Sequence, residues 1–227
     1  MKRAVLVLLA LAGLVAQRRR DDGFFHTAVP EHRYSLTLGR VDAASVTATV
    51  LAQEELEGYF ELGGTRKTET RAFAKSEPVS VKLDGLAVDA AVTYRFCFRR
   101  PGAKEFERSE AREFHTRRAP GQGFRFVMQA DSHLDENSQP ELYRRTLERM
   151  RDERADFLMD LGDTFMTDKR REDYHEAKAQ YLAQRYWFGL VGASTPVFLV
   201  LGNHDGEDGA RREMAKWSLD LRRRYFP

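Results

Sequence analysis

The first part of the chain is built from short runs in which hydrophobic and polar residues alternate. These runs are rich in β-branched and aromatic residues and occupy positions 34–38, 46–50, 58–62, 79–83 and 93–98. Turn residues separate them, including Gly63-Gly64 and Asp84-Gly85. A period of two is that of a strand with one buried face, and several such strands at close spacing are typical of two packed sheets. The pattern predicts an all-β sandwich over residues 34–117.

The pattern changes after residues 118–123, a segment with Pro and Gly that we predict to be a linker. Three runs that are almost wholly apolar follow at positions 124–130, 157–161 and 196–201, and helical patterns at 139–153 and 171–190 lie between them. Strands that are apolar throughout are typical of a parallel sheet sandwiched by helices. Residues 124–227 are therefore predicted to form part of an α/β domain, with a mainly parallel, mixed sheet and flanking helices.

The N-terminus has the pattern of an export signal. Met1-Lys2-Arg3 is basic, and the apolar run from position 4 to 16 is shorter than the roughly 20 residues that span a bilayer. We predict a signal peptide at 1–16 and a leader segment at 17–33, with cleavage after Ala16 favoured over Ala12. The basic residues Arg18–Arg20 leave an uncleaved signal anchor open. The sequence thus predicts an exported protein with no stable membrane span beyond this segment.

Composition narrows the class of protein further. The chain is 42% hydrophobic and 32% charged, as in soluble globular proteins, and its formal net charge of +2 gives no reason to expect nucleic-acid binding. The basic run Arg222–Arg224 is interleaved with acidic residues nearby and is predicted to be a solvated helix face. The single cysteine, Cys97, excludes an intramolecular disulfide and is predicted to be a small buried hydrophobe.

Polar side chains gather where each of the three apolar strands ends. The first strand runs into Asp131 and His133, the second into Asp163, and the third into Asn203-His204-Asp205. In an open α/β sheet the carboxyl ends of the strands meet at one edge, where ligands bind. One such cluster alone would more often be turn chemistry than a site. Three clusters at three successive strand ends favour a site.

The residue types indicate which chemistry this site carries. Carboxylate, imidazole and amide oxygen form a ligand set for Mn, Fe or Zn, without thiolate. Two such cations about 3.5–4 Å apart can clamp a phosphoryl group and activate a hydroxide for in-line attack. Asp163 is the candidate for the bridging carboxylate. Asp131 and His133 are predicted to bind one ion, since side chains at i and i+2 of an extended backbone project to the same side, and Asn203 to bind the other.

The last two residues of the third cluster are the candidates for proton transfer. His204 follows a predicted ligand and is placed to protonate the leaving alkoxide or to hydrogen bond to a phosphate oxygen. Asp205 is predicted either to orient that histidine or to cap the helix that follows. Asp135 and Glu136 are left outside the site, and the aromatic residues Tyr181, Tyr186, Trp187 and Phe188 are predicted to be core rather than pocket lining.

Together, Asp131-x-His133, Gly162-Asp163 and Gly202-Asn203-His204-Asp205 resemble the motifs of the calcineurin-like metallophosphoesterases. The resemblance implies hydrolysis of phosphate mono- or diesters by a dinuclear metal centre. A β-sandwich in front of such a domain is similar to the layout of purple acid phosphatases and exported bacterial alkaline phosphatases. Purple acid phosphatases have a tyrosine ligand where this chain has Met166, so their iron–tyrosinate site is disfavoured.

The sandwich itself resembles a fibronectin type III module. The turn Leu83-Asp84-Gly85-Leu86 precedes Tyr94, and in that module a tyrosine packs in a corner and bonds back to the backbone. The resemblance therefore implies such a bond for Tyr94.

The family completes its metal site with a further histidine block, and this chain has no histidine after His204. We therefore expect the chain to be a fragment of a longer enzyme. The remaining histidines are predicted to be ordinary solvated or packed residues: His26, His32, His115 and His175. The alternative is an exported, non-catalytic binding protein whose sandwich recognises a partner or a glycan. The sequence leaves the exact substrate, the metal and the oligomeric state open.

Overall fold

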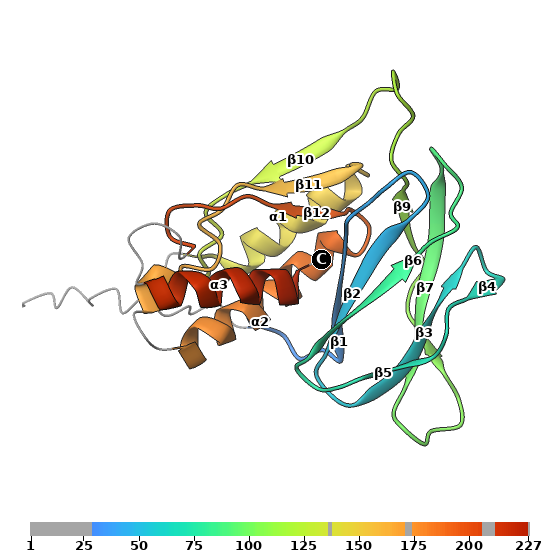
Figure 1. The fold of residues 1–227 in the computed structure, drawn as a ribbon, viewed down its shortest axis with the longest axis horizontal. Helices are drawn as coiled ribbons and strands as arrows, with labels where there is room; N and C mark the ends of the chain where they lie inside the picture. The colour runs from blue at the N-terminus through green and yellow to red at the C-terminus, as the bar shows by residue number, and fades with distance from the viewer. Residues whose placement is uncertain (1–28, 136–137, 171–173, 206–211, 227) are drawn as a thin grey trace, which may run out of the picture.

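The computed structural model describes residues 29–135, 138–170, 174–205 and 212–226 (Figure 1). The predicted signal peptide lies outside them. Two antiparallel sheets pack face to face in the first region. One sheet has the order β1-β2-β6; the other has the order β4-β3-β7-β8, with β5 also paired to β3 and β9 to β7. The strands are β1 (Tyr34–Gly39), β2 (Val46–Ala52), β3 (Leu56–Leu62), β4 (Arg66–Lys67), β5 (Arg71–Phe73), β6 (Pro78–Leu83), β7 (Ala91–Arg99), β8 (Glu107–Arg108) and β9 (Arg112–His115).

The sandwich is held together by the inward-facing residues that the alternation predicts. Phe60 of β3 and Tyr94 and Phe96 of β7 are almost fully buried in one cluster, and their rings lie within 6.0 Å of Phe60. Cys97 is buried and free, as predicted. The sandwich architecture thus follows from the period-two pattern.

The second region has the predicted order of strand, helix, strand, helix, strand. Its three strands pair in parallel in the order β10-β11-β12. Within the described ranges the sheet has no antiparallel strand, so the mixed sheet is not seen there. The elements are β10 (Phe126–Gln129), α1 (Pro140–Asp152), β11 (Phe157–Asp160), the short 3-10 helix η1 (Thr167–Arg170), α2 (Tyr174–Gly192), β12 (Val197–Leu199) and α3 (Arg212–Tyr225).

The prediction that helices cover both faces of this sheet is wrong for the described residues. Helices α1 and α2 lie on the same side of the sheet (Figure 1), where Leu158 of β11 packs into their core. On the other face Phe126, Met128 and Phe198 remain exposed by 43%, 52% and 40%. Apolar residues on both faces of a strand predict burial of both faces, whereas here the apolar side chains of one face are exposed.

The two regions are joined by polar contacts between strands of the sandwich and helix α2 with the residue after it. The hydroxyl of Tyr94 donates to the carbonyl oxygen of Ala193 at 2.6 Å, so the tyrosine bonds across to the second region instead of back to the sandwich. Arg185 of α2 is fully buried and donates to the hydroxyl of Thr37 and to the carbonyl oxygen of Thr49. Burial lowers the pKa of its guanidinium to about 9, because a low-dielectric surrounding disfavours the charged form.

No helix among the described residues is long and apolar enough to cross a membrane.

Candidate metal centre

The parallel strands bring the first two polar clusters to one edge of the sheet. Asp131, His133 and Asp163 each offer one ligand atom, and these three atoms lie within 4.8 Å of one another. Nε2 of His133 is 3.6 Å from Oδ1 of Asp131. Three of the four residues that we predicted as metal ligands therefore meet.

The two nitrogens of the His133 imidazole have different surroundings, and one of them is placed to bind a metal ion. Its Nδ1 lies 3.3 Å from Oδ2 of Asp135, and a carboxylate can only accept, so Nδ1 carries the proton of the neutral ring. The other nitrogen, Nε2, is buried and has no hydrogen-bond partner among the described residues. Such an arrangement is typical of a metal-bound histidine held by a carboxylate behind it. Asp135, which we left outside the predicted site, therefore supports it.

The backbone at two of these residues is left-handed. Asp131 has φ = 58° and Asp163 has φ = 53°, a region that aspartate adopts more easily than most residues but still at a cost. Asp131 lies beyond the end of β10, so the prediction that it projects with His133 from an extended backbone is wrong. The loop conformation, not strand alternation, brings the two side chains together.

Two glycines allow the second and third motif loops to touch. A Cβ atom on Gly162 would lie 2.0 Å from the amide nitrogen of Gly202, and a Cβ on Gly202 would lie 2.2 Å from Oδ1 of Asp163. The amide of His204 also donates to that oxygen at 2.9 Å. Only glycine permits this approach, because any side chain would displace backbone.

The carboxylate of Asp205 hydrogen bonds to both of these loops. Asp205 is 1% exposed. Its Oδ1 accepts from the amides of Thr164 at 3.0 Å and Phe165 at 2.8 Å, and its Oδ2 from those of Asp163 and Gly202 at 2.9 Å each. Asp205 therefore binds four backbone amides. The prediction that it caps the next helix concerns residues 206–211, which lie outside the described residues.

The residue that orients His204 is Asp168, which the sequence analysis missed. Oδ2 of Asp168 lies 2.7 Å from Nδ1 of His204. The prediction that Asp205 orients this histidine is therefore corrected, since both Asp205 oxygens are engaged with amides. Nothing in the sequence marked Asp168, which lies in η1, five positions after Asp163.

Asn203 lies in the turn after β12 and is exposed. Its neighbours on both sides, Gly202 and His204, contact Asp163. This places the predicted amide ligand in the loop that touches the proposed bridging carboxylate.

A second carboxylate lies beneath the site. Asp160, at the end of β11, is fully buried and accepts from the hydroxyl of Thr164 at 2.5 Å, the amide of Gly162 at 3.2 Å and Nε2 of Gln129 at 2.8 Å. Burial raises its pKa to about 6, although these hydrogen bonds oppose the rise. Sequence reasoning treated this residue as part of an apolar strand.

The other residues considered in the sequence analysis do not belong to the group of Asp131, His133 and Asp163. Tyr181, Trp187 and Phe188 are buried in the core, as predicted. His26 lies outside the described residues, and the described histidines at 32, 115 and 175 do not join the metal-binding group. The prediction of a solvated basic face is wrong for Arg222, which is 6% exposed and donates to the carbonyl oxygen of Asp205 at 3.0 Å.

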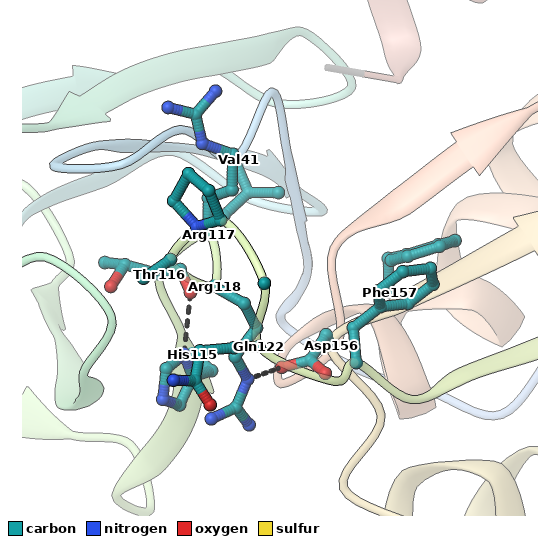
Figure 2. Close-up of a pocket in the computed structure, with 12 residues that line it drawn as sticks. Val41, His115, Thr116, Arg117, Arg118, Gln122, Asp156 and Phe157 are labelled. Atoms are coloured by element: carbon teal, nitrogen blue, oxygen red, sulfur yellow. Dashed lines mark hydrogen bonds and ion pairs between the residues drawn. The ribbon is translucent and has the colours of Figure 1, made fainter.

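A cavity of about 310 Å³ lies at the other end of the sheet, where β11 begins. Figure 2 shows it between the segment that joins the two regions and Phe157, with Nε of Arg118 donating to Oδ1 of Asp156 at 2.8 Å. Its walls are mainly apolar, Arg118 is paired with Asp156, and Arg117 is paired with Asp42 outside the cavity. This cavity is therefore separate from the metal-binding residues.

Comparison with known proteins confirms the resemblance that the motifs carry. Residues 124–226 match the family model described as calcineurin-like phosphoesterase. No curated protein sequence gives a significant match. A solved structure of PhoD superposes with a TM-score of 0.58 at 16% sequence identity, and the match covers 87% of this chain and 46% of that one. The chain thus spans about half the length of that relative and shares its fold across both regions.

Other solved structures match a smaller part of the chain. An fn3 domain of human collagen alpha-1(XX) covers 43% of this chain and 92% of its own at 14% identity, with a TM-score of 0.28. A redesigned β-sandwich protein covers 37% and 90% at 15% identity, also with a TM-score of 0.28. Scores of this size do not assign the sandwich to a family.

Proposed function

We propose that the chain carries the metal centre of a phosphoesterase that hydrolyses phosphate mono- or diesters, because residues 124–226 match the calcineurin-like phosphoesterase model. The observation that carries the proposal is the His133 imidazole. Its Nε2 is buried without a partner beside two carboxylates, while its Nδ1 is held by Asp135. Without a cation this arrangement would be costly, because an unpaired buried polar atom destabilises the fold.

The proposed centre is dinuclear. Asp131 and His133 would hold one ion, Asp163 would bridge, and Asn203 would contribute an amide oxygen to the second. The donor set contains oxygen and nitrogen but no sulfur, which suits Mn, Fe or Zn. When bound, such ions neutralise phosphate oxygens and lower the pKa of a water molecule.

In the proposed reaction His204 would transfer the proton and Asp168 would orient His204. The carboxylate of Asp168 holds Nδ1–H of His204, which leaves Nε2 to bond to the substrate. In the protonated ring, Nε2–H can give its proton to the oxygen of the departing alcohol. The Asp168 carboxylate stabilises the positive charge of that ring, so His204 remains oriented through the transfer.

The N-terminal segment and the sandwich supply the remaining parts of the proposal. The basic and apolar residues at 1–16 support export. The two packed antiparallel sheets support a fibronectin type III-like arrangement for residues 34–117, as a framework for the metal centre. Tyr94 departs from that arrangement, because its hydroxyl bonds to Ala193 of the second region. The alternative, a non-catalytic exported binding protein, predicts the same sandwich but no metal and no turnover.

The proposal is tested by metal content and turnover together. Plasma mass spectrometry on the purified chain should find transition metal at near-stoichiometric amounts, and p-nitrophenyl phosphate or its bis ester should be hydrolysed. Asp163→Asn should lower both, whereas Asp220→Asn, an exposed carboxylate on α3, should change neither. Wild-type protein that binds no metal and turns over neither substrate would contradict the proposal and favour the binding protein.

Asp168→Asn separates proton transfer from metal binding. We expect kcat to fall about tenfold or more, because general acid catalysis is worth about 10²–10⁴ and depends on imidazole orientation. Metal content should equal that of the wild type, since Asp168 contacts His204 rather than the ligand group. Loss of metal in this variant would show that Asp168 is part of the metal site and not a residue that positions His204.

A further inference from the structure

We infer that Gln180 and Gln184 of helix α2 are positioning residues that set the spacing between the loop carrying Asp131 and His133 and the loop carrying Asp163. The inference rests on the metal centre proposed above. It assigns the preformed geometry of that centre to two uncharged side chains that bind no metal themselves.

Gln180 bridges the two loops with a single amide group. The side chain is fully buried. Its Nε2 donates to the carbonyl oxygen of His133 at 2.6 Å and to that of Thr164 at 3.1 Å. One accepting residue is a predicted ligand and the other directly follows one, so this nitrogen fixes how far apart the two loops lie.

Gln184 repeats the bridge one helical turn later. It is also fully buried, and its Nε2 donates to the hydroxyl of Ser132 at 3.1 Å and to the carbonyl oxygen of Thr164 at 2.9 Å. Ser132 lies between the two ligands of the first loop. Residues at i and i+4 share one face of a helix, so α2 presents two amides in register to both loops.

Packing does not require amides at these positions. Their neighbours on the helix, Tyr181 and Trp187, belong to an apolar core, in which leucine or methionine would fill the same space. Burying an amide is unfavourable unless its donors are matched by acceptors. Here the acceptors are backbone and hydroxyl groups of the metal loops. The hydrogen bonds that the glutamines donate to these loops therefore explain why amides stand at these positions.

Helix α2 is anchored independently of the metal loops. The next residue after Gln184 is Arg185, which donates to Thr37 and Thr49 of the sandwich. The helix is thus fixed on the sandwich by one side chain and holds the metal loops by two others. The spacing of the loops therefore depends on the contact between the two regions.

The consequence is a centre whose donor atoms lie within 4.8 Å of one another. Both loops contain a left-handed aspartate, at Asp131 and Asp163, and such strained backbone persists only where surrounding contacts hold it. Without the two amides the loops would relax apart, and part of the binding energy would be spent on bringing them together. Changes behind a ligand typically lower metal affinity by about 10- to 100-fold.

The test compares Gln180→Met and Gln184→Met with the wild type in two measurements. Methionine keeps the length of the side chain and removes the donor. By isothermal titration calorimetry with Mn²⁺, we expect each variant to bind about tenfold more weakly. In chelator-treated protein, we expect hydrogen exchange to quicken in the segments 131–135 and 162–166 but not in the sandwich strands. The second measurement needs neither metal nor activity.

Thr116→Val is the matched control. It also removes buried hydrogen bonds, those of the Thr116 hydroxyl with the carbonyl oxygen of Ala87 and the amide of Ala90, but these bonds lie within the sandwich, so Mn²⁺ affinity and loop exchange should stay at the wild-type level. Equal affinity and equal loop exchange in the folded glutamine variants would overturn this inference alone. If the wild type binds no Mn²⁺ the proposed function fails, and the exchange data still decide whether the glutamines hold the loops. Should one variant not fold, Gln180→Asn, which retains a shorter amide, takes its place and is expected to lose less affinity.

Discussion

The inside of the sandwich and the layer beneath the metal centre are both buried, but the second contains polar and charged side chains among its apolar ones. The sandwich buries aromatic and aliphatic residues such as Phe60 and Phe96. The layer between the parallel sheet and α2 buries polar and charged residues as well. Those at 1% exposure or less that bond to the motif loops are Asp160, Thr164, Gln180, Gln184 and Asp205.

The difference shows what each region is built to do. Apolar contacts are weakly directional, so a core made of them stabilises the fold and tolerates small shifts. Buried polar groups stabilise only when each finds a partner in the right place, and an unmatched one is costly. The polar layer therefore fixes the positions of the metal loops, at the risk of large losses when one partner is removed.

The largest expected effect comes from removing the carboxylate that holds four amides. Asp205→Ala leaves these buried amides without their acceptor, and we expect the free energy of unfolding to fall by about 4 kcal/mol. Glu61→Ala in the sandwich removes a carboxylate that is 7% exposed and lies 3.8 Å from Arg108. For that weak pair we expect a loss of about 1 kcal/mol or less. Urea denaturation of both variants measures the difference, and equal losses would remove the distinction between the regions.

The contact between the motif loops gives the next largest effect. In Gly202→Ala the new methyl group would meet Asp163, at 2.2 Å from Oδ1 and 2.3 Å from the amide nitrogen. Backbone must shift, so we expect a loss of about 3 kcal/mol together with weaker Mn²⁺ binding. Gly123→Ala has no heavy atom within 4 Å of its methyl and should stay within about 0.5 kcal/mol of the wild type. Thermal denaturation distinguishes the two, and a tolerated Gly202→Ala would show that the loops can separate freely.

The part of the site that could be predicted follows from chain order. Three apolar strands joined by helices run parallel, so their carboxyl ends meet, and Asp131, His133 and Asp163 lie together as expected. The apolar core of α2 could be predicted for the same reason, since Trp187 and Phe188 follow the helical pattern. These predictions need only periodicity and topology.

What could not be predicted depends on which of several polar groups meet after folding. Asp205 directly follows His204 in the sequence and Asp168 does not, yet the folded loop shows that Asp168 is the aspartate that reaches the imidazole. Gln180 and Gln184 look like ordinary polar positions of a charged helix. The open face of the sheet could not be predicted either, because apolar residues such as Phe126 and Phe198 indicate burial without saying what covers them.

Asp160 gives the smallest effect, and one with a defined pH dependence. Its pKa is about 6 in the folded protein against 3.8 for an unperturbed side chain. Between these values the folded state binds more protons than the unfolded state, so stability falls as pH rises from about 4 to about 6 and is constant above. In Asp160→Asn this contribution disappears. Relative to the wild type, the variant should gain roughly 2 kcal/mol in unfolding free energy between about pH 4 and pH 8, measured by urea denaturation with chelator present.

The surroundings of Asp160 make the asparagine variant a fair comparison. Oε1 of Gln129 is buried and has no partner in the described part of the chain, so rotation of the Gln129 amide would let it accept from the new Nδ2. The Asp220→Asn variant on the surface of α3 controls for a change in net charge and should differ from the wild type by a constant amount across the same pH range. A constant difference for Asp160→Asn as well would mean that the ionised carboxylate is not destabilised by burial. In that case the polar layer would be as well solvated as a surface, and its contrast with the sandwich would lose its physical basis.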